Sequence, residues 1–334
     1  MEEKYKNNNI KKALITGIGG QDAAYMAMFL LEKGYKVFRI GRSINKDKLW
    51  RLEELGIKDK IEYLNGDITD ALFIFDAFKS IQPDECYNFA AVSFVGLSWK
   101  VPQSTISINV DGVVNILEAI KQNSSHTRLY QAGSSEMFGK SQTETQNELT
   151  KFDPCNPYGV SKLAAYNFTK IYRDVYGVYV SNAFCYNHES ELRGIEYVTR
   201  KITDGVARIA YGFSKELRLG NIESRRDWGF AGDYVKGMWA MLQQDKPDDY
   251  VLATGNTHSI REFLELAFKS VGIFDWEKYV VQDRNFYRPV EPFLLCGDST
   301  KAEHNLNWKA ELNFEDLVAK MVSFDLKRIK KENG

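Results

Sequence analysis

The stretch ALITGIGGQDAA, residues 13–24, decides the first unit of the fold. Residues 13–16 form a short apolar run, typical of a buried strand, which leads directly into a turn with three glycines. The following residues up to Lys33 carry apolar side chains at helical spacing, and Gly34 is placed to end that helix. A strand, a glycine turn and a helix in this order predict the beginning of a strand–helix–strand unit.

The rest of the first half continues to alternate between the two patterns. We expect further strands at 36–40, 61–64, 85–90 and 128–132, and further helices near 71–80 and 107–122. Strands that alternate with helices pair in parallel, because each helix carries the chain back to the same end of the sheet. The fold class that this predicts is α/β, with a doubly wound, Rossmann-type parallel sheet.

The second half has a looser pattern, with longer irregular segments. Helices are expected near 198–211, 232–244, 259–270 and 314–328, and short strands at 217–219 and 250–253. No linker rich in Pro, Gly or Ser separates the halves. We therefore expect a first domain at 1–185, joined by later segments from 215–260, and a smaller α/β lobe at 186–334 with a soft, discontinuous boundary.

Composition and charge exclude several classes of protein. The chain has 334 residues with 44 Lys and Arg against 45 Asp and Glu, so no basic surface is expected for a nucleic acid polymer. It has no apolar run of about 18 residues and no leader pattern, so neither a membrane protein nor export is expected. The four cysteines are far apart and lack metal-ligand spacing, which predicts reduced thiols in the cytoplasm and no metal site.

The glycine turn carries the first functional prediction. Gly17 and Gly20 allow a tight turn and a close approach of the backbone to a phosphate, and Ala23 takes the third position of the motif. The helix that starts at Gln21 and Asp22 offers free N–H groups and the positive end of its dipole. The sequence therefore predicts a dinucleotide site here, whereas the structural alternative is an ordinary glycine turn.

The ends of the next strands bear on the choice of dinucleotide. The second strand ends in RIGRS, residues 39–43, without the acidic residue that binds a free ribose 2′-hydroxyl. Arg42 can pair with a 2′-phosphate, which favours NADP and leaves NAD as the alternative. Asp67 and Ile68 follow the third strand, where Asp67 would contact the adenine, and Ala90 ends the fourth strand as a further predicted cofactor contact. A surface arginine and a turn aspartate are the structural alternatives.

Tyr158 and Lys162 open a predicted helix after two prolines. Their i, i+4 spacing places both side chains on one face. A lysine ammonium beside a phenol is expected to lower the tyrosine pKa, so that Tyr158 acts as a base towards a substrate hydroxyl. The same spacing is common on ordinary solvated helices, but here it follows a nucleotide-binding array.

The segment AGSSEMFG, residues 132–139, comes directly after the fifth strand. Ligands of such sheets bind at the carboxyl ends of the strands. Ser134 can bond the same hydroxyl as Tyr158, and Glu136 adds a carboxylate that simple dehydrogenation does not need. A serine-rich turn with a capping glutamate is the structural alternative.

Together with several later blocks, these residues resemble the GDP-mannose 4,6-dehydratase family of the extended short-chain dehydrogenase/reductase superfamily. The resemblance runs over about residues 11–325, and its later blocks are NHES at 187–190, VTRK at 198–201, LGN at 219–221, RDWG at 226–229, DYV at 249–251, and RP at 288–289 with Glu291. It implies that residues 1–185 bind the dinucleotide and that 186–334 bind a sugar nucleotide. It also implies a hydro-lyase that converts GDP-mannose to its 4-keto-6-deoxy product.

The resemblance implies a role for each catalytic residue. Tyr158, activated by Lys162, removes the O4 proton while a hydride passes from C4 to NADP⁺. Glu136 removes the C5 proton, and Ser135 or protonated Glu136 assists the departure of water from C6. The hydride then returns to C6, so that the net reaction is a loss of water.

The resemblance further implies the residues that hold the nucleotide half of the substrate. These are Ser93, Asn187, Lys201, Arg218, Arg226, Arg288 and Glu291. Arg226 and Arg288 would neutralise the pyrophosphate, and Glu291 would accept from ribose hydroxyl or guanine N–H groups. The alternative for each is a surface ion pair, and His188 is expected to be structural. Relatives form dimers or tetramers, so a homodimer or homotetramer is expected.

Three departures from the family pattern leave the sugar open. Val92, Gly133 and Glu191 replace the usual residues close to the expected sugar site. A GDP-D-glycero-D-manno-heptose is therefore an alternative substrate for the same chemistry. A C4 epimerase or simple dehydrogenase, and a non-catalytic NADP-binding protein, are weaker alternatives, since neither explains Glu136 beside Tyr158 and Lys162.

Overall fold

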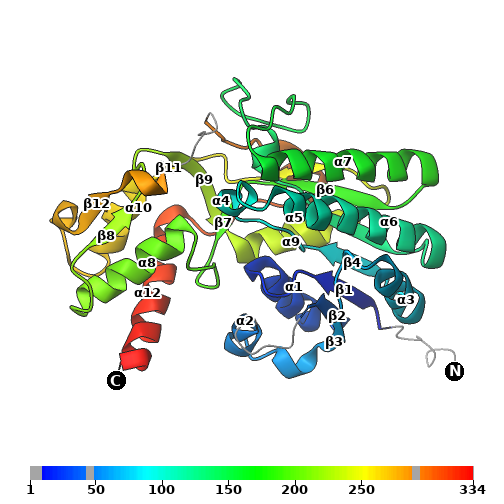
Figure 1. The fold of residues 1–334 in the computed structure, drawn as a ribbon, viewed down its shortest axis with the longest axis horizontal. Coiled ribbons are helices and arrows are strands. Elements are labelled where there is room, and N and C mark those ends of the chain that lie inside the picture. The colour runs from blue at the N-terminus through cyan, green and yellow to red at the C-terminus, as the bar shows by residue number, and fades with distance from the viewer. Residues whose placement is uncertain (1–9, 43–48, 288–293, 334) are drawn as a thin grey trace, which may run out of the picture.

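A seven-stranded sheet forms the centre of the protein (Figure 1). The structure is a computed structural model that describes residues 10–42, 49–287 and 294–333. In the order of the sheet, the strands are β10 (Tyr250–Leu252), β6 (Val180–Cys185), β5 (Arg128–Ala132), β4 (Glu85–Asn88), β1 (Lys12–Thr16), β2 (Lys36–Gly41) and β3 (Glu62–Asn65). Every neighbouring pair is parallel. The predicted doubly wound α/β fold is therefore confirmed.

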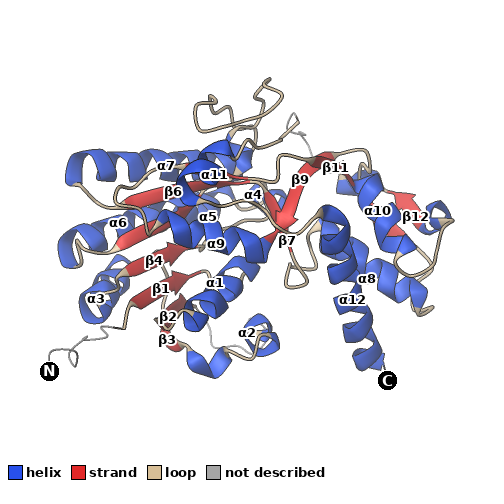
Figure 2. Ribbon diagram, turned by 180° about the vertical axis from the view of Figure 1, so that it is seen from behind, coloured by secondary structure: helices blue, strands red, loops and turns tan. Residues whose placement is uncertain are grey.

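Helices cover both faces of this sheet, as the two opposite views show (Figure 2). One layer contains α3 (Ala71–Ile81), α6 (Gly112–Asn123) and α7 (Pro157–Tyr176), and the other contains α1 (Gln21–Glu32), α9 (Ala231–Met241) and α11 (Thr300–Leu306). Each layer has its own apolar core against the sheet. Phe78 and Leu117 are fully buried in the first, and Ala23 and Met238 are buried in the second.

The sequence pattern predicts no strand where β6 lies. Ser181 and Asn182 interrupt its apolar run, yet the whole strand is buried. The side chain of Asn182 donates to Asp249 Oδ1 at 2.8 Å and accepts from Thr169 Oγ1 at 3.0 Å. A polar side chain is tolerated in a core when its hydrogen bonds are made there.

The sheet takes its last strand from the second half of the chain. β10 pairs with β6, and α9 packs against α1. By contrast, β8 (Leu217–Leu219) pairs with β12 (Val280–Gln282), away from the central sheet. The boundary between the two domains stays a prediction.

A smaller lobe stands beside the carboxyl ends of the strands (Figure 1). It contains α8 (Val198–Ala210), α10 (Ile260–Lys269) and α12 (Phe314–Asn333), with a three-stranded sheet of β11 (Thr257–Ser259), β9 (Arg225–Phe230) and β7 (Asn187–Glu189). Trp228 stacks on Phe314 in its core, with ring centroids 5.9 Å apart. The lobe thus has an apolar core separate from those of the main sheet.

The helix expected at 107–122 begins earlier and contains a wide turn. It consists of α5 (Pro102–Ile106), a π-helical turn at Ser107–Asp111, and α6. Asn109 in the wide turn accepts from the Val92 backbone N–H at 2.8 Å and donates to Ser161 Oγ at 2.9 Å. The irregular turn therefore ties the loop after β4 to the helix that carries the predicted catalytic pair.

The remaining elements are short. They are α2 (Trp50–Glu54), α4 (Val95–Ser98) and single 3₁₀ turns at Lys58–Lys60, Ser135–Met137, Trp276–Tyr279 and Arg284–Phe286. Within the described ranges, no helix has the length and apolar character needed to cross a membrane.

Candidate active site

The glycine turn has the geometry that a phosphate-binding turn requires. Gly17 has a φ of +71°, and a Cβ there would lie 2.6 Å from the backbone of Ala90, so only glycine fits. Gly20 precedes α1, and no side chain caps that end of the helix. In the part of the chain that the structure describes, no hydrogen bond uses the N–H groups of residues 21–23. These groups fit the pyrophosphate of a dinucleotide.

The side chains of Gln21 and Asp22 are used within the protein. Gln21 donates to the His188 carbonyl and accepts from Ser190 Oγ, both at 2.7 Å. Asp22 lies 3.0 Å from His188 Nε2. Burial alone raises the pKa of Asp22 and lowers that of His188, but their mutual attraction reverses both directions. The backbone of residues 21 and 22 therefore remains for the predicted cofactor contact, and His188 joins the two lobes.

The residues predicted at the adenosine end lie close together. Arg42 Nη1 is 3.7 Å from Asp67 Oδ2, and the Arg42 side chain is 63% exposed. The side chain of Ile68 is buried in the core. The backbone N–H of Ala90 donates to Thr16 Oγ1 at 3.2 Å. Arg42 and Asp67 are thus available to a ligand, whereas Ile68 and Ala90 shape the site through their backbone.

The predicted catalytic pair lies at the start of α7. Asn156 Oδ1 accepts from the Gly159 N–H at 2.8 Å and caps the helix. Tyr158 and Lys162 are both buried. A Cβ on Gly159 would lie 2.5 Å from the Glu136 carbonyl oxygen, so this glycine lets the helix end touch the segment after β5.

Burial acts on the pKa of both members of this pair. Lys162 Nζ donates to the Ala132 carbonyl at 2.7 Å, and burial lowers its pKa to about 8. Burial raises the pKa of Tyr158, and a hydrogen bond with Ser134 opposes this only in part. The ammonium is therefore directed at a backbone carbonyl, and the lowering of the Tyr158 pKa by Lys162 stays a prediction.

The segment after β5 meets α7 at this point. Ser134 Oγ accepts from the Glu136 N–H at 3.2 Å, and Ser135 and Glu136 are buried. Glu136 Oε2 accepts a 2.7 Å hydrogen bond from the Asn156 amide. A hydroxyl, a carboxylate, a phenol and an ammonium therefore converge at the carboxyl end of β5. Such a set can exchange protons at two neighbouring carbons of one substrate.

The residues predicted for the substrate nucleotide are more widely spread. Ser93 Oγ lies 2.9 Å from the Tyr197 hydroxyl, which precedes α8. One turn later, Lys201 Nζ lies 3.5 Å from the centre of the Phe286 ring, and burial lowers its pKa. Asn187 begins β7, opposite Trp228 of β9.

Two of the predicted arginines lie in β8 and β9. Arg218 forms ion pairs with Glu216 at 2.7 Å and Asp283 at 3.7 Å. Arg226 is buried and donates to the Arg225 carbonyl at 2.7 Å. Arg288 and Glu291 lie outside the described residues.

The three departures from the family pattern have local structural roles. Glu191 accepts from the Tyr25 hydroxyl at 2.8 Å and pairs with Lys320 at 3.1 Å. A Cβ on Gly133 would lie 2.5 Å from the Ala183 carbonyl oxygen. Val92 is held through its backbone by Asn109. These contacts account for Glu191 and Gly133, whereas nothing in the structure explains the side chain of Val92.

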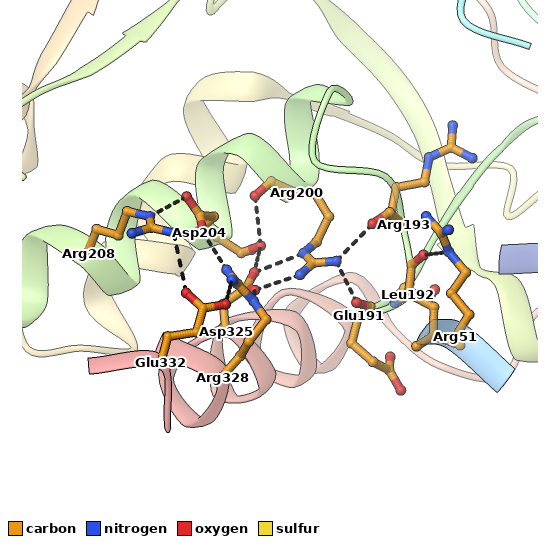
Figure 3. A network of polar contacts seen from close by, with 12 residues as sticks. Arg51, Glu191, Leu192, Arg193, Arg200, Asp204, Arg208, Asp325, Arg328 and Glu332 are labelled. Carbon is orange, nitrogen blue, oxygen red and sulfur yellow. Dashed lines mark hydrogen bonds and ion pairs between the residues drawn. The ribbon is translucent and has the colours of Figure 1, made fainter. Parts of the chain in front are cut away.

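The loop at 191–193 is held by a polar network that the sequence does not predict (Figure 3). Arg51 of α2 donates to the Gly19 carbonyl and to the Leu192 carbonyl, each at 2.5 Å. From the other side, Arg200 donates to the carbonyls of residues 191 and 193 and is itself held by Asp325 at 2.7 Å. The glycine turn and the C-terminal helix are therefore connected through this loop.

Two residues near the catalytic set also escaped prediction. Arg193 pairs with Glu189 at 3.1 Å, and its charge favours ionised Tyr158. Asn156 contacts Glu136 directly. Asn before Pro157 is a signal for a helix cap, but neither residue carries a signal that indicates a place in the site.

The comparison with known proteins agrees with this geometry. The family model described as GDP-mannose 4,6 dehydratase matches residues 14–321. The chain belongs to the GDP-mannose 4,6-dehydratase family. This confirms the predicted resemblance and the enzyme class, a hydro-lyase. One member, GDP-mannose 4,6 dehydratase 1 of Arabidopsis thaliana, is 45% identical, with 96% of this chain and 91% of the relative covered. The human member is 40% identical over 94% of this chain and 91% of its own.

More distant solved structures share the architecture of this family. The UDP-glucose 4-epimerase of Thermotoga maritima has a TM-score of 0.84 at 18% identity and covers 95% of this chain and 99% of its own. The dTDP-glucose 4,6-dehydratase of Bacillus anthracis, solved with NAD, has a TM-score of 0.83 at 21% identity and covers 96% and 98%. At these identities the likeness concerns the fold.

Proposed function

We propose that the chain removes water from GDP-mannose to give the GDP-4-keto-6-deoxy sugar. The observation that carries this proposal is the position of Glu136 beside the pair of Tyr158 and Lys162 at the end of β5. A C4 epimerase or a dehydrogenase needs no carboxylate at C5. The relatives at 40–45% identity are named for GDP-mannose, which favours it over a GDP-manno-heptose.

The proposed steps follow from the atoms that the site offers. A nicotinamide dinucleotide held at the uncapped end of α1 would supply the hydride transfer that joins C4 to C6. Tyr158 Oη takes the proton of O4, and Lys162 holds the end of β5 against α7. Glu136 takes the C5 proton, which the 4-ketone makes acidic, and a proton from Glu136 or Ser135 leaves with O6 as water. Tyr158 ends the cycle by giving up the proton that it took, as C5 is protonated again.

We propose NADP as the dinucleotide. The uncapped end of α1 would hold the pyrophosphate, as its unused N–H groups suggest. Arg42 lies just after β2, exposed and 3.7 Å from Asp67, where it would pair with a 2′-phosphate. An unpaired Asp67 would instead favour NAD, because its charge repels that phosphate.

For the guanosine diphosphate we propose cations of the smaller lobe. Lys201, Arg218 and Arg226 come from α8, β8 and β9. Arg226 is buried, so its charge acts in a medium that screens it little. Ser93, Asn187, Arg288 and Glu291 complete the proposed set on the strength of the family pattern.

We also propose that the protein is a homodimer or homotetramer in the cytoplasm. The outer face of α7 exposes apolar side chains at helical spacing, namely Val160, Phe168, Ile171 and Val175. An apolar stripe of this kind is typical of an interface between subunits. The free cysteines are compatible with a reducing compartment. Sedimentation of the unaltered chain and of Ile171→Glu tests the interface.

The direct test is incubation with NADP⁺ and GDP-mannose, followed by mass spectrometry. We expect a product lighter by one water that carries a keto group, without net accumulation of reduced cofactor. Incubation with a GDP-manno-heptose is the matched control for the sugar. Net reduction of the cofactor, or conversion of the heptose alone, would contradict the proposal.

A further inference from the structure

Tyr197 meets a residue of the loop after β4 through its hydroxyl group. It stands directly before α8, and its Oη lies 2.9 Å from Ser93 Oγ. In the described ranges, neither hydroxyl makes another hydrogen bond with the protein. Two bonded hydroxyl groups share one hydrogen, so the second hydrogen and several lone pairs are left for a third partner. The pair can therefore bind one more hydroxyl group.

The ring of Tyr197 is held from two sides. The Arg193 guanidinium lies over the ring, 3.7 Å from its centre, and Arg193 pairs with Glu189 at 3.1 Å. Phe94 meets the ring at a steep angle, with centroids 5.6 Å apart. These contacts fix the direction of the hydroxyl before a ligand arrives, so little ordering is left for binding.

The hydroxyl pair lies beside the proposed catalytic cluster. β4 and β5 are neighbours in the sheet, and the loops that follow them carry Ser93 and Glu136. Asn109 ties the loop after β4 to α7. Burial is the main cause that raises the pKa of Tyr158, and the charges of Tyr197 and Glu136 raise it further. The Tyr158 phenol therefore has a carboxylate and a second phenol as electrostatic neighbours.

We propose that Tyr197 Oη and Ser93 Oγ together bind the O3 hydroxyl of the sugar. The inference rests on the proposed function, in which Tyr158 acts on O4 and Glu136 acts on C5. The ring carbon C4 has two carbon neighbours, C5 and C3. Since Glu136 serves C5, the other polar group beside Tyr158 faces C3. A bond at O3 orients O4 towards the phenol and C5 towards the carboxylate.

One substitution removes the hydroxyl and leaves the rest of the contact in place. Tyr197→Phe keeps a ring for Arg193 and Phe94, so we expect the melting temperature to stay within a few degrees. Its kcat/KM for GDP-mannose should fall about tenfold, because one hydrogen bond to the substrate is lost. Tyr211→Phe, at the exposed end of α8, is the matched control and should change kcat/KM less than about twofold.

Substrate analogues test which sugar oxygen the hydroxyl binds. With GDP-3-deoxymannose, which lacks O3, Tyr197→Phe should cost less than about twofold, since the partner of the hydroxyl is already missing. With GDP-2-deoxymannose, the same substitution should still cost about tenfold.

Three results would overturn the inference. The first is an unchanged kcat/KM of Tyr197→Phe for GDP-mannose. The second is an equal loss with GDP-mannose and both analogues, which would make the hydroxyl a link between segments of the protein only. The third is a loss that disappears with the 2-deoxy analogue, which would assign the contact to O2. If the unaltered protein never dehydrates GDP-mannose, the proposed function fails instead.

Discussion

The proposed catalytic cluster and Arg218, on the face of the smaller lobe proposed for the nucleotide, are built in different ways. At the cluster, Glu136 and Lys162 are buried. Glu136 accepts a hydrogen bond of 2.7 Å from the Asn156 amide, and Lys162 donates one of 2.7 Å to the Ala132 carbonyl. On the smaller lobe, Arg218 is paired with two acidic side chains at the surface.

This difference separates chemistry from binding. Groups that move protons are held in place before a substrate arrives, so little reorganisation remains for the reaction. A surface cation must exchange its carboxylate for a phosphate, which costs part of the binding energy and depends on salt. Substitutions in the cluster should therefore lower kcat, and those on the face should raise KM.

The largest effect is expected at Glu136. Glu136→Gln removes the base at C5, and kcat for dehydration should fall by about 10³-fold. Oxidation at C4 should persist, so reduced cofactor accumulates in a single turnover. Tyr158→Phe is the matched control, in which oxidation and dehydration both stop. Dehydration at the normal rate by Glu136→Gln would remove Glu136 from the mechanism.

The second effect is expected at Arg226. Arg226→Met should raise KM for GDP-mannose about 10- to 100-fold with a small change in kcat, since a buried cation would be lost from the pyrophosphate. Its neighbour Arg225 is exposed and pairs with Glu262, so Arg225→Met should change KM less than about twofold. If Arg226→Met lowered kcat and left KM unchanged, the idea that this arginine serves binding and not catalysis would be wrong.

A smaller effect is expected at the adenosine end. Arg42→Ala should weaken the binding of NADP about tenfold and leave that of NAD nearly unchanged, because one exposed charge pair with a 2′-phosphate is lost. Binding measured by calorimetry at two salt concentrations checks both the loss and its screening. If Arg42→Ala weakened the binding of NADP and NAD equally, Arg42 would contact a part of the cofactor that both dinucleotides share.

The last effect concerns the stability of the fold, and it lies at Lys162. Its pKa is about 8 in the folded protein, whereas a solvated lysine has a pKa of 10.5, so the unfolded chain binds more protons between these values. The free energy of unfolding therefore rises with pH across this window, by on the order of 2–3 kcal/mol from this one group. Lys162→Met lacks this contribution. Urea unfolding of both proteins at pH 7 and pH 10 should show the gain only in the unaltered protein.

Much of this arrangement follows from local sequence patterns. The apolar run before Gly17 and the residues after it predict β1, the glycine turn and α1. The spacing of apolar residues distinguishes a strand from a helix within a few residues. The spacing of Tyr158 and Lys162 predicts a shared helix face, and the segment at 134–136 predicts their neighbour at the end of β5. Each of these predictions needs only short-range geometry and the parallel order of the sheet.

The remainder depends on contacts between distant segments. The polar residues of β6 do not suggest a strand, because the carboxylate that satisfies Asn182 belongs to Asp249, far along the chain. Lys162 is directed at the Ala132 carbonyl, a partner that spacing along α7 does not reveal. The bridge by Arg51 likewise joins carbonyls, which carry no sequence signal.

The late arrival of β10 has a consequence for synthesis on the ribosome. β6 is complete when residue 185 has been added, but its outer neighbour in the sheet ends only at Leu252. Until then, the nascent chain exposes an unpaired strand edge with a buried-type sequence, which invites pairing with other chains. A chain stopped between these points should therefore require a chaperone to stay in solution, although its dinucleotide turn is already present.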